Sequence, residues 1–465
     1  MPLTSTVART ALHPATPAAP RTPVHAPARH ETVPATLGDH LLIPLAGGVA
    51  QYANLDHAAS TPALVGVKGA VDRALATYSS VHRGNGYASR VTSRWYEEAR
   101  AEVATFVGAR PDDTVVFTRA TTDSWSVLAH VLPQDTTVVV FATEHHSTLL
   151  PWGAERTITL PVPASLPEAL GRLEATVAAV TSRHCLVVVT AASNVTGEIW
   201  PIDRIAEITA RHGARLAVDA AQFAPHRPID LAASGIDYIA FSGHKLYAPF
   251  GTGVLAGRSD WLDDATPYLI GGGATARVTS GEHPTALPAP TWAAGAARHE
   301  GGSPNVIGAI ALAAACSALR RNWTAVQAHE ERLAQRLRDG LAAIEGVRTY
   351  SIFGDDAVSA GAIDRVGVVA FTVDGVASSE ISAALSFEHG IGVRDGKFCA
   401  HLLVDHLLEG TDHDTAVRAS VGLASTDEHI ERLIAAVTAI AGRVRAGTWT
   451  APVDTHLEDD AIRPW

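Results

Sequence analysis

From about residue 50 onward, short runs of β-branched and other apolar residues alternate with longer, helix-length segments. The runs are apolar at consecutive positions, which is typical of parallel strands whose two faces are both covered by helices. This order predicts an α/β fold with right-handed crossover connections. No internal repeat of about 20 to 50 residues is present, which argues against a solenoid or a propeller. The expected strands lie at 114–117, 136–142, 185–191, 215–220 and 237–243.

The pattern changes after about residue 325, where a long amphipathic helix is predicted over about 325–344 and the apolar run RVGVVAFTVDG follows it. We therefore expect a large domain over 50–310 and a smaller α+β domain over 325–446. The Ala-rich run from Val306 to Leu319 is too short for a bilayer-spanning helix, which needs about 20 residues. It predicts a buried core helix instead.

The two ends of the chain differ in composition from its middle. Residues 1–37 are rich in Pro, Ala and Thr and contain no acid before Glu31, so we expect a disordered tail. An organelle transit peptide is the alternative, whereas the apolar block of a secretory signal is absent. Residues 447–465 are expected to form an acidic tail.

Composition argues against several classes of function. Lys and Arg total 36 and Asp and Glu total 48, which gives a formal net charge of −12, so neither nucleic-acid nor membrane binding is expected. The three cysteines, Cys185, Cys316 and Cys399, are too widely spaced for a disulfide framework or a zinc cluster, and no metal is expected. Free cysteines favour a reducing compartment, and we expect a cytoplasmic location.

Ligands of open parallel sheets bind beyond the carboxyl ends of the strands, so the polar residues after the apolar runs are the candidates for chemistry. Lys245 follows one run, in FSGHKLYAP, and a lysine buried there could act as a Schiff-base nucleophile. An exposed loop lysine is the alternative. Asp219 lies at the end of another, in AVDAAQ, where it could pair with the protonated ring nitrogen of pyridoxal phosphate (PLP). A metal ligand or a helix cap is the alternative for this aspartate.

Three more segments place polar residues directly after expected strands. TVVFTRATTDSW puts Thr121 and Thr122 at a helix start, where backbone N–H groups can bind a phosphate, although an ordinary Thr N-cap is as common. TEHHSTLLPW puts His145 where its flat ring could stack on a cofactor, and no third metal ligand lies at suitable spacing. ASNVTGEIW puts Asn194 where its amide could bind a ring oxygen or a substrate carboxylate.

Together these motifs resemble the class V aminotransferase and cysteine desulfurase family of fold-type I PLP-dependent enzymes, from about Asn54 to Leu433. The resemblance implies a large domain with a mostly parallel seven-stranded sheet and a small α+β C-terminal domain. It implies that Lys245 is the Schiff-base lysine, that Asp219 pairs with the pyridinium nitrogen, and that His145 stacks on the ring. It also implies cofactor or phosphate contacts by Thr121, Thr122, Asn194, Gln222, Ser242 and His244.

Two further segments match the family at its substrate and subunit contacts. RHEGGSPN resembles the loop that reaches the phosphate bound by the neighbouring subunit, with Ser303 where Thr is usual, which implies a homodimer with shared active sites. VRASVGLAST puts Arg418 at the position of the arginine that binds the substrate carboxylate. A guanidinium suits that role, and a surface arginine is the alternative.

GVRDGKFCAH, residues 392–401, resembles the RxGxxCAH-like loop of cysteine desulfurases. Cys399 matches their persulfide-forming cysteine, and Arg394 matches the substrate-binding arginine at the loop start. A small apolar filler is the alternative for Cys399, and it suits Cys185 and Cys316 better.

Two departures from the family pattern lie on the substrate side. Gly86 stands where many desulfurases have a second histidine after their HRG segment, and Lys397 and Phe398 replace the usual polar pair before the cysteine. The cofactor positions are all filled, which argues against a non-catalytic role.

The expected reaction converts L-cysteine to L-alanine and leaves the sulfur as a persulfide on Cys399, with Lys245 as the base. A small-molecule amino acid is the expected substrate, and a sulfur-acceptor protein would be a further partner. A PLP-dependent carbon–sulfur lyase acting on a cysteine conjugate is one alternative. A class V aminotransferase or epimerase of a biosynthetic pathway is another, and neither alternative needs Cys399.

Overall fold

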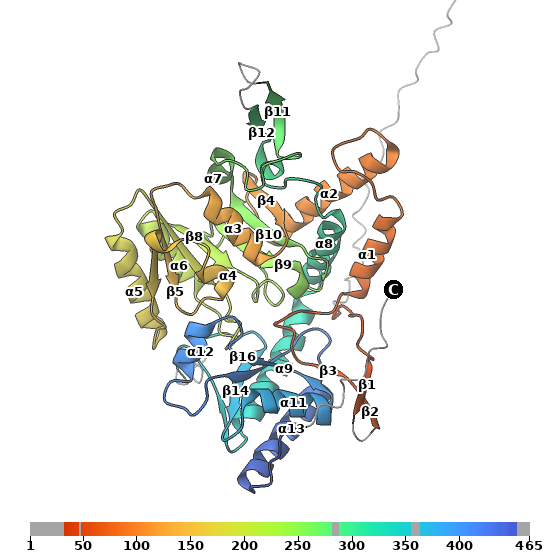
Figure 1. The fold of residues 1–465 in the computed structure, drawn as a ribbon, viewed down its shortest axis with the longest axis vertical. Helices are drawn as coiled ribbons and strands as arrows, with labels where there is room; N and C mark the ends of the chain where they lie inside the picture. Colours follow the sequence, from red (N-terminus) through yellow and green to blue (C-terminus); the bar gives the residue numbers. More distant parts are fainter. Residues whose placement is uncertain (1–31, 46–47, 281–287, 355–362, 453–465) are drawn as a thin grey trace, which may run out of the picture.

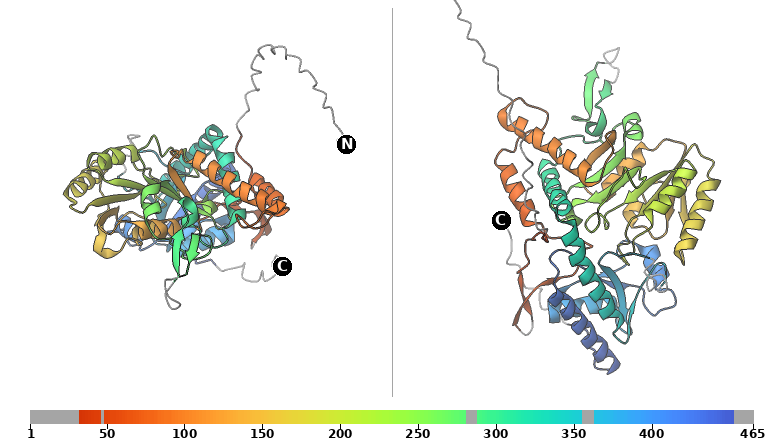
Figure 2. Two further views of the ribbon diagram at one scale, coloured as in Figure 1. Left: turned by 90° about the horizontal axis from the view of Figure 1, so that it is seen from above. Right: turned by 180° about the vertical axis from the view of Figure 1, so that it is seen from behind.

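A computed structural model of the protein describes residues 32–45, 48–280, 288–354 and 363–452 (Figure 1). Residues 1–31 and 453–465, which make up most of the two predicted tails, lie outside the described residues. Two sheets organise the described part, a large one in the first half of the chain and a smaller one near its end. Figure 2 shows helices α8 (Val306–Arg320) and α9 (Trp323–Ala342) leading from one half to the other along the back of the molecule.

The large sheet has seven strands, and its strand order is β4-β10-β9-β8-β7-β5-β6. Only β10 is antiparallel to its neighbours, so the predicted mostly parallel sheet is confirmed. All five predicted apolar runs form strands, whereas β6 and β10 were not predicted. The strands are β4 (Asp113–Thr118), β5 (Thr136–Phe141), β6 (Thr157–Leu160), β7 (His184–Thr190), β8 (Arg215–Asp219), β9 (Tyr238–Ser242) and β10 (Gly253–Arg258).

Alternate residues of strand β7 enter two different hydrophobic clusters. Val187 and Val189 pack into one cluster and Leu186 and Val188 into the other, and all four are fully buried. The continuous apolar run therefore reflects a sheet that is covered on both faces. The covering helices and their neighbours are α1 (Val65–Leu75), α2 (Tyr87–Phe106), α3 (Thr121–Val131), α4 (His146–Leu149), α5 (Leu166–Ala179), α6 (Ile202–Arg211), α7 (Ser259–Asp264) and α8.

Helix α8 contains the Ala-rich run and packs against α1 and α2. Leu312 and Cys316 in this helix are fully buried, which agrees with the predicted core helix. No described helix combines the length and the hydropathy that crossing a bilayer requires. A hairpin of β11 (Thr275–Thr279) and β12 (Ala289–Trp292) projects from the body beyond α7 (Figure 1).

The small sheet has the antiparallel order β13-β14-β17-β16. Its strands are β13 (Val347–Thr349), β14 (Val368–Val373), β16 (Arg394–Gly396) and β17 (Ala416–Ser420). Helices α9, α11 (Ser378–His389), α12 (His401–Leu407) and α13 (Asp427–Arg445) accompany it. Strand β3 (Ala53–Asn54) pairs in parallel with β15 (Ile391–Gly392), and Leu55 lies in the small-domain core. The chain segment at 53–55 thus packs with the small domain, although the predicted large domain over 50–310 includes it.

The described ends of the two predicted tails contact the rest of the protein. Thr36 is buried and forms a bridge with Leu64, and a hairpin of β1 (Leu42–Leu45) and β2 (Gly48–Gln51) follows it. The predicted disordered tail therefore extends too far at its C-terminal end. In the predicted acidic tail, Trp449 lies over the guanidinium of Arg443. Composition does not reveal either contact, because composition does not specify which residues meet in the fold.

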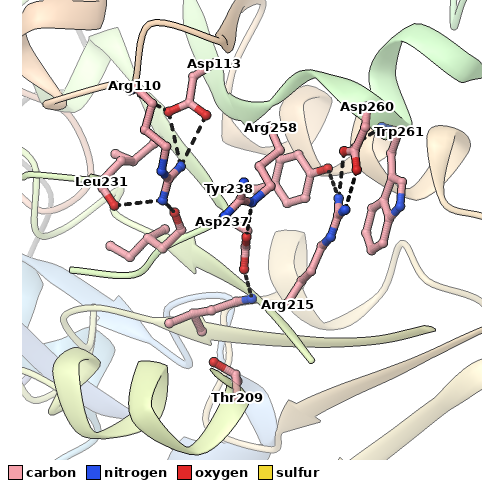
Figure 3. Close-up of polar contacts among 12 residues, drawn as sticks. Arg110, Asp113, Thr209, Arg215, Leu231, Asp237, Tyr238, Arg258, Asp260 and Trp261 are labelled. Atoms are coloured by element: carbon pink, nitrogen blue, oxygen red, sulfur yellow. Dashed lines mark hydrogen bonds and ion pairs between the residues drawn. The ribbon is translucent and has the colours of Figure 1, made fainter. Parts of the chain in front are cut away.

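The amino ends of the parallel strands are closed by a row of ion pairs (Figure 3). Three arginines pair with three aspartates there: Arg110 with Asp113, Arg215 with Asp260, and Arg258 with Asp237. Arg110 also donates to the carbonyl oxygens of Leu231 and Ile236. These interactions lie at the end of the sheet opposite to the predicted site.

Candidate active site

A pocket of about 190 Å³ lies at the carboxyl ends of the parallel strands, between the large and small domains. All predicted site residues line it except Cys399 and Ser303. The predicted residues that the structure brings together here are Thr121, Thr122, His145, Asn194, Asp219, Gln222, Ser242, His244, Lys245, Arg394 and Arg418.

One end of the pocket is formed by the start of helix α3. Ala120 precedes the helix and provides no side-chain cap, so Thr121 is not an N-cap. The backbone N–H of Thr121 donates to Ser242 Oγ at 2.8 Å, and the two hydroxyl oxygens are 2.7 Å apart. A helix start with free N–H groups and adjacent hydroxyls can bind an anion such as a phosphate.

Asp219 ends strand β8, and its side chain is buried. Its two oxygens accept hydrogen bonds from the backbone N–H of Ala221 at 2.8 Å and from Thr148 Oγ1 at 2.5 Å. Among the described residues no Lys, Arg or His nitrogen lies within 4.0 Å of this carboxylate. Because a buried carboxylate without a cation is unfavourable, the site suits a ligand that brings a positively charged N–H group.

Lys245 follows strand β9 and faces the same pocket. Desolvation lowers the pKa of Lys245 to about 8; Asp219 raises it, and Arg418 and Arg394 lower it further. A lysine with this pKa is neutral far more often near pH 7 than an ordinary lysine, so it can act as a nucleophile or a base. The alternative of an exposed loop lysine does not fit this position.

His145 is the N-cap of helix α4, and its Nδ1 accepts a hydrogen bond from the backbone N–H of Ser147 at 3.1 Å. Desolvation, followed by the charge of Lys245, lowers the pKa of His145 to about 3. The ring is therefore neutral, which suits stacking on an aromatic ligand. Within the described ranges, no three His, Cys, Asp or Glu side chains are grouped so that they could hold a metal ion.

Arg418 lies on strand β17 and is only 1% exposed. Its Nη2 is 2.9 Å from Asp56 Oδ1, and its Nη1 donates to the carbonyl oxygen of Asn194 at 3.1 Å. Its Nε has no hydrogen-bond partner in the described part of the chain. Arg394 is its direct partner across the sheet. The alternative of a surface arginine is therefore wrong, and the two cations give this wall of the pocket an affinity for a carboxylate.

Cys399 lies beside the pocket and is partly exposed. Its Sγ accepts a hydrogen bond from Arg394 Nη2 at 3.5 Å. Burial raises the pKa of Cys185 to about 11 and raises that of Cys316 well above its ordinary value. Of the three cysteines, Cys399 is therefore the one that is accessible to a reactant.

The loop before Cys399 has an unusual backbone. Phe398 and Cys399 both have left-handed φ angles, 52° and 56°. Such a conformation costs on the order of 1–3 kcal/mol for each non-glycine residue and needs support from its surroundings. The amide nitrogen of Asn194 supplies part of that support, because it donates to the carbonyl oxygen of Phe398 at 2.8 Å.

Ser303 is exposed and lies away from the pocket of its own chain. The neighbouring Gly302 accepts a hydrogen bond from Arg83 Nη2 at 2.8 Å, so the RHEGGSPN loop lies against the HRG segment. The structure thus brings two family-like segments together at the surface, outside the pocket.

Sequence reasoning missed residues that support the predicted ones. Asp56 binds Arg418, Thr148 binds Asp219, and Ser147 and Thr190 line the pocket. The local sequence does not mark Asp56 or Thr148, because each becomes significant only through a partner distant in the chain.

Comparisons with known proteins agree with this geometry. Residues 53–433 match the family model of class V aminotransferases. A cysteine desulfurase of Dickeya dadantii is 36% identical over 400 residues, which cover 82% of this chain and 90% of that protein. A probable cysteine desulfurase of Halalkalibacterium halodurans is 33% identical, with the same coverage of the two chains.

Solved structures are similar as well. The apo structure of a cysteine desulfurase from Thermococcus onnurineus has a TM-score of 0.73 and 29% identity, and the match covers 84% of this chain and 95% of that one. The cysteine desulfurase CsdA from Escherichia coli has a TM-score of 0.69 and 30% identity over the same shares of the two chains. Since the family model matches most of the chain, this protein belongs to the class V aminotransferase family.

Proposed function

We propose that the protein is a PLP-dependent cysteine desulfurase, which converts L-cysteine to L-alanine and retains the sulfur as a persulfide on Cys399. The observation that carries this proposal is the position of Cys399, a partly exposed thiol 3.5 Å from Arg394 at the rim of a pocket lined by Lys245 and Arg418. The names of the relatives are consistent with it.

The pocket fits PLP at each of its chemical groups. Asp219, buried without a cation among the described residues, would hold the protonated ring nitrogen, and the start of helix α3 with Ser242 would hold the phosphate. His145 would stack on the ring, and Lys245 would attach the cofactor covalently. When bound, PLP supplies an electron-withdrawing ring that makes the α-proton of the substrate removable.

The side chains of the protein divide the remaining work. Arg418 and Arg394 bind the substrate carboxylate, and Lys245 Nζ takes the α-proton from the bound substrate. The thiolate of Cys399 then attacks the substrate sulfur. A sulfur–sulfur bond forms as the bond from sulfur to the β-carbon breaks, and that electron pair stays with the β-carbon. Protonation of this carbon, together with return of the α-proton from Lys245 to the α-carbon, yields L-alanine, so the atoms and electrons balance.

We also infer a homodimer in which Ser303 completes the phosphate site of the partner subunit. Its exposed position outside the pocket of its own chain supports this. A mixture of Lys245→Ala and Ser303→Trp chains should form some sites that are intact in both parts and so regain activity. A protein that is monomeric by light scattering and still binds PLP fully would refute the shared site.

The proposal includes a cytoplasmic location and transfer of the sulfur to an acceptor protein. Three free thiols are consistent with a reducing compartment. A persulfide on a partly exposed cysteine is accessible to an acceptor thiol, which can remove the outer sulfur by thiol exchange.

The test is product analysis of the PLP-loaded protein with L-cysteine. We expect L-alanine, and a thiol probe should find the persulfide at Cys399. Cys399→Ser should abolish alanine formation and leave the bound PLP unchanged, whereas the control Cys185→Ser should keep wild-type turnover. If the wild-type product is pyruvate, or if Cys399→Ser is fully active, the lyase alternative is correct instead.

A further inference from the structure

Phe398 differs from the polar residues expected before the cysteine, and its side chain is 1% exposed. The loop that carries it leaves strand β16 of the small domain, and the ring belongs to a hydrophobic cluster that contains the core of the large domain together with small-domain residues such as Ala370 and Ala416. Ala400 and Leu403 enter the same cluster. The ring of Phe398 therefore anchors the cysteine loop in an apolar core that the two domains share.

The backbone of this loop is held from the large domain as well. Asn194 donates to the carbonyl oxygen of Phe398, and the backbone N–H of His146 donates to that of Cys399, both at 2.8 Å. Within the small domain, Lys397 Nζ lies 2.5 Å from Asp405 Oδ1. With two consecutive left-handed residues, this turn keeps its shape only while these contacts and the buried ring persist.

The same ring contacts the arginine that we assign to the substrate carboxylate. Arg418 Cζ lies 5.2 Å from the centre of the Phe398 ring, within the range of a cation–π interaction. Asp56 and Asn194 bind the edge of this guanidinium, and the ring lies against its face. The guanidinium is thus held from two directions, and one of them is supplied by the residue next to the nucleophile.

We propose that Phe398 is a positioning residue that couples the carboxylate-binding arginine to the cysteine loop. Its ring orients Arg418, and its burial fixes the backbone of Cys399, so that the distance between the carboxylate site and the thiol is set by one side chain. The catalytic consequence rests on the proposed desulfurase function, but the structural coupling does not.

The two contributions can be separated by two substitutions. Phe398→Leu keeps an apolar side chain in the core but removes the aromatic face, so it should raise KM for L-cysteine about 5- to 30-fold, with a smaller change in kcat. Phe398→Ala also removes the anchor, so it should lower kcat and make Cys399 react several-fold faster with iodoacetamide in the PLP-loaded protein without substrate.

The matched control is Phe106→Leu, the same change at a buried phenylalanine of the same hydrophobic cluster. It should leave KM and the alkylation rate as in the wild type. Alkylation of each cysteine is followed by mass spectrometry, and the buried Cys185 and Cys316 should stay unreactive if the fold is intact. If Cys185 and Cys316 become reactive in Phe398→Ala, the fold of that variant is perturbed. The KM of Phe398→Leu, which leaves a smaller cavity, then decides the test.

Wild-type KM in Phe398→Leu together with wild-type alkylation in Phe398→Ala would overturn the coupling, as would an equal shift in Phe106→Leu. The alkylation of Phe398→Ala requires no turnover. If the wild-type protein makes no alanine from L-cysteine, the proposed function fails, and faster alkylation in Phe398→Ala would still support the anchoring role.

Discussion

At the amino end of the seven-stranded sheet, Asp237 accepts hydrogen bonds from Arg258 Nε at 2.5 Å and from the backbone of Leu216 at 2.9 Å (Figure 3). At the carboxyl end of the same sheet, Asp219 is buried with no cationic partner among the described residues. Both aspartates adjoin strands of one core, so local burial does not explain the difference.

The partners that close the amino end are all supplied by the chain itself. Arg215 pairs with Asp260, donates to the hydroxyl of Tyr238 at 2.8 Å and lies 3.9 Å from the ring centre of Trp261. Such contacts satisfy the charges at this end and contribute to stability. At the other end, Lys245 and Asp219 keep their hydrogen-bonding capacity for a ligand. We therefore expect substitutions at the amino end to lower the stability of the fold, and substitutions at the carboxyl end to lower ligand binding or catalysis.

The largest effect is expected at Lys245. Lys245→Ala removes the side chain that we propose as both the covalent attachment point and the base, so kcat should fall by about a thousandfold or more. Borohydride reduction followed by peptide mapping should label Lys245 in the wild type and no lysine in the variant. A label on a different lysine would show that the assignment is wrong.

Arg418→Ala should affect substrate binding without releasing PLP. Loss of a buried, charge-assisted partner costs about 2–5 kcal/mol, so kcat/KM for L-cysteine should fall by at least about thirtyfold. Steady-state kinetics together with the PLP absorbance measures both quantities. An unchanged kcat/KM would remove Arg418 from the substrate site.

A change at the amino end should reduce stability and leave catalysis unchanged. Asp237→Ala leaves Arg258 and the N–H of Leu216 without their acceptor, which should lower the free energy of unfolding by about 1–3 kcal/mol. Urea unfolding of the variant, compared with kcat/KM, tests this.

The matched change at the carboxyl end is Asp219→Ala, which should weaken PLP binding and lower the stability of the PLP-free protein less than Asp237→Ala does. The opposite order would break the comparison between the two ends.

The smallest effect is a pH dependence of cofactor uptake. The pKa of Lys245 is lowered to about 8, and the neutral amine is the form that reacts with the aldehyde of PLP. The rate of uptake by the PLP-free protein should therefore rise about tenfold per pH unit below pH 8 and level off above it. Stopped-flow absorbance measures this rate, and a rise that continues to pH 10 would place the pKa of Lys245 near its ordinary value.

The sequence by itself determined the mostly parallel sheet and most of the pocket. Continuous apolar runs such as 185–191 predict strands covered on both faces, and parallel strands bring the residues that follow them to one edge. Asp219 and Lys245 could be identified because Asp219 lies at the end of one such run and Lys245 follows shortly after another. The antiparallel strand β10 has no comparable local signal that separates it from its parallel neighbours.

Only the tertiary structure decided which residues complete the site. Asp56 contacts Arg418, and Phe398 contacts Asn194, over long separations in sequence. The pairing of Ala53–Asn54 with Ile391–Gly392 likewise joins distant segments. Patterns along a chain report periodicity, and periodicity shows which face of an element is buried. It carries no information about which distant group meets that face, because this depends on how the two domains pack together.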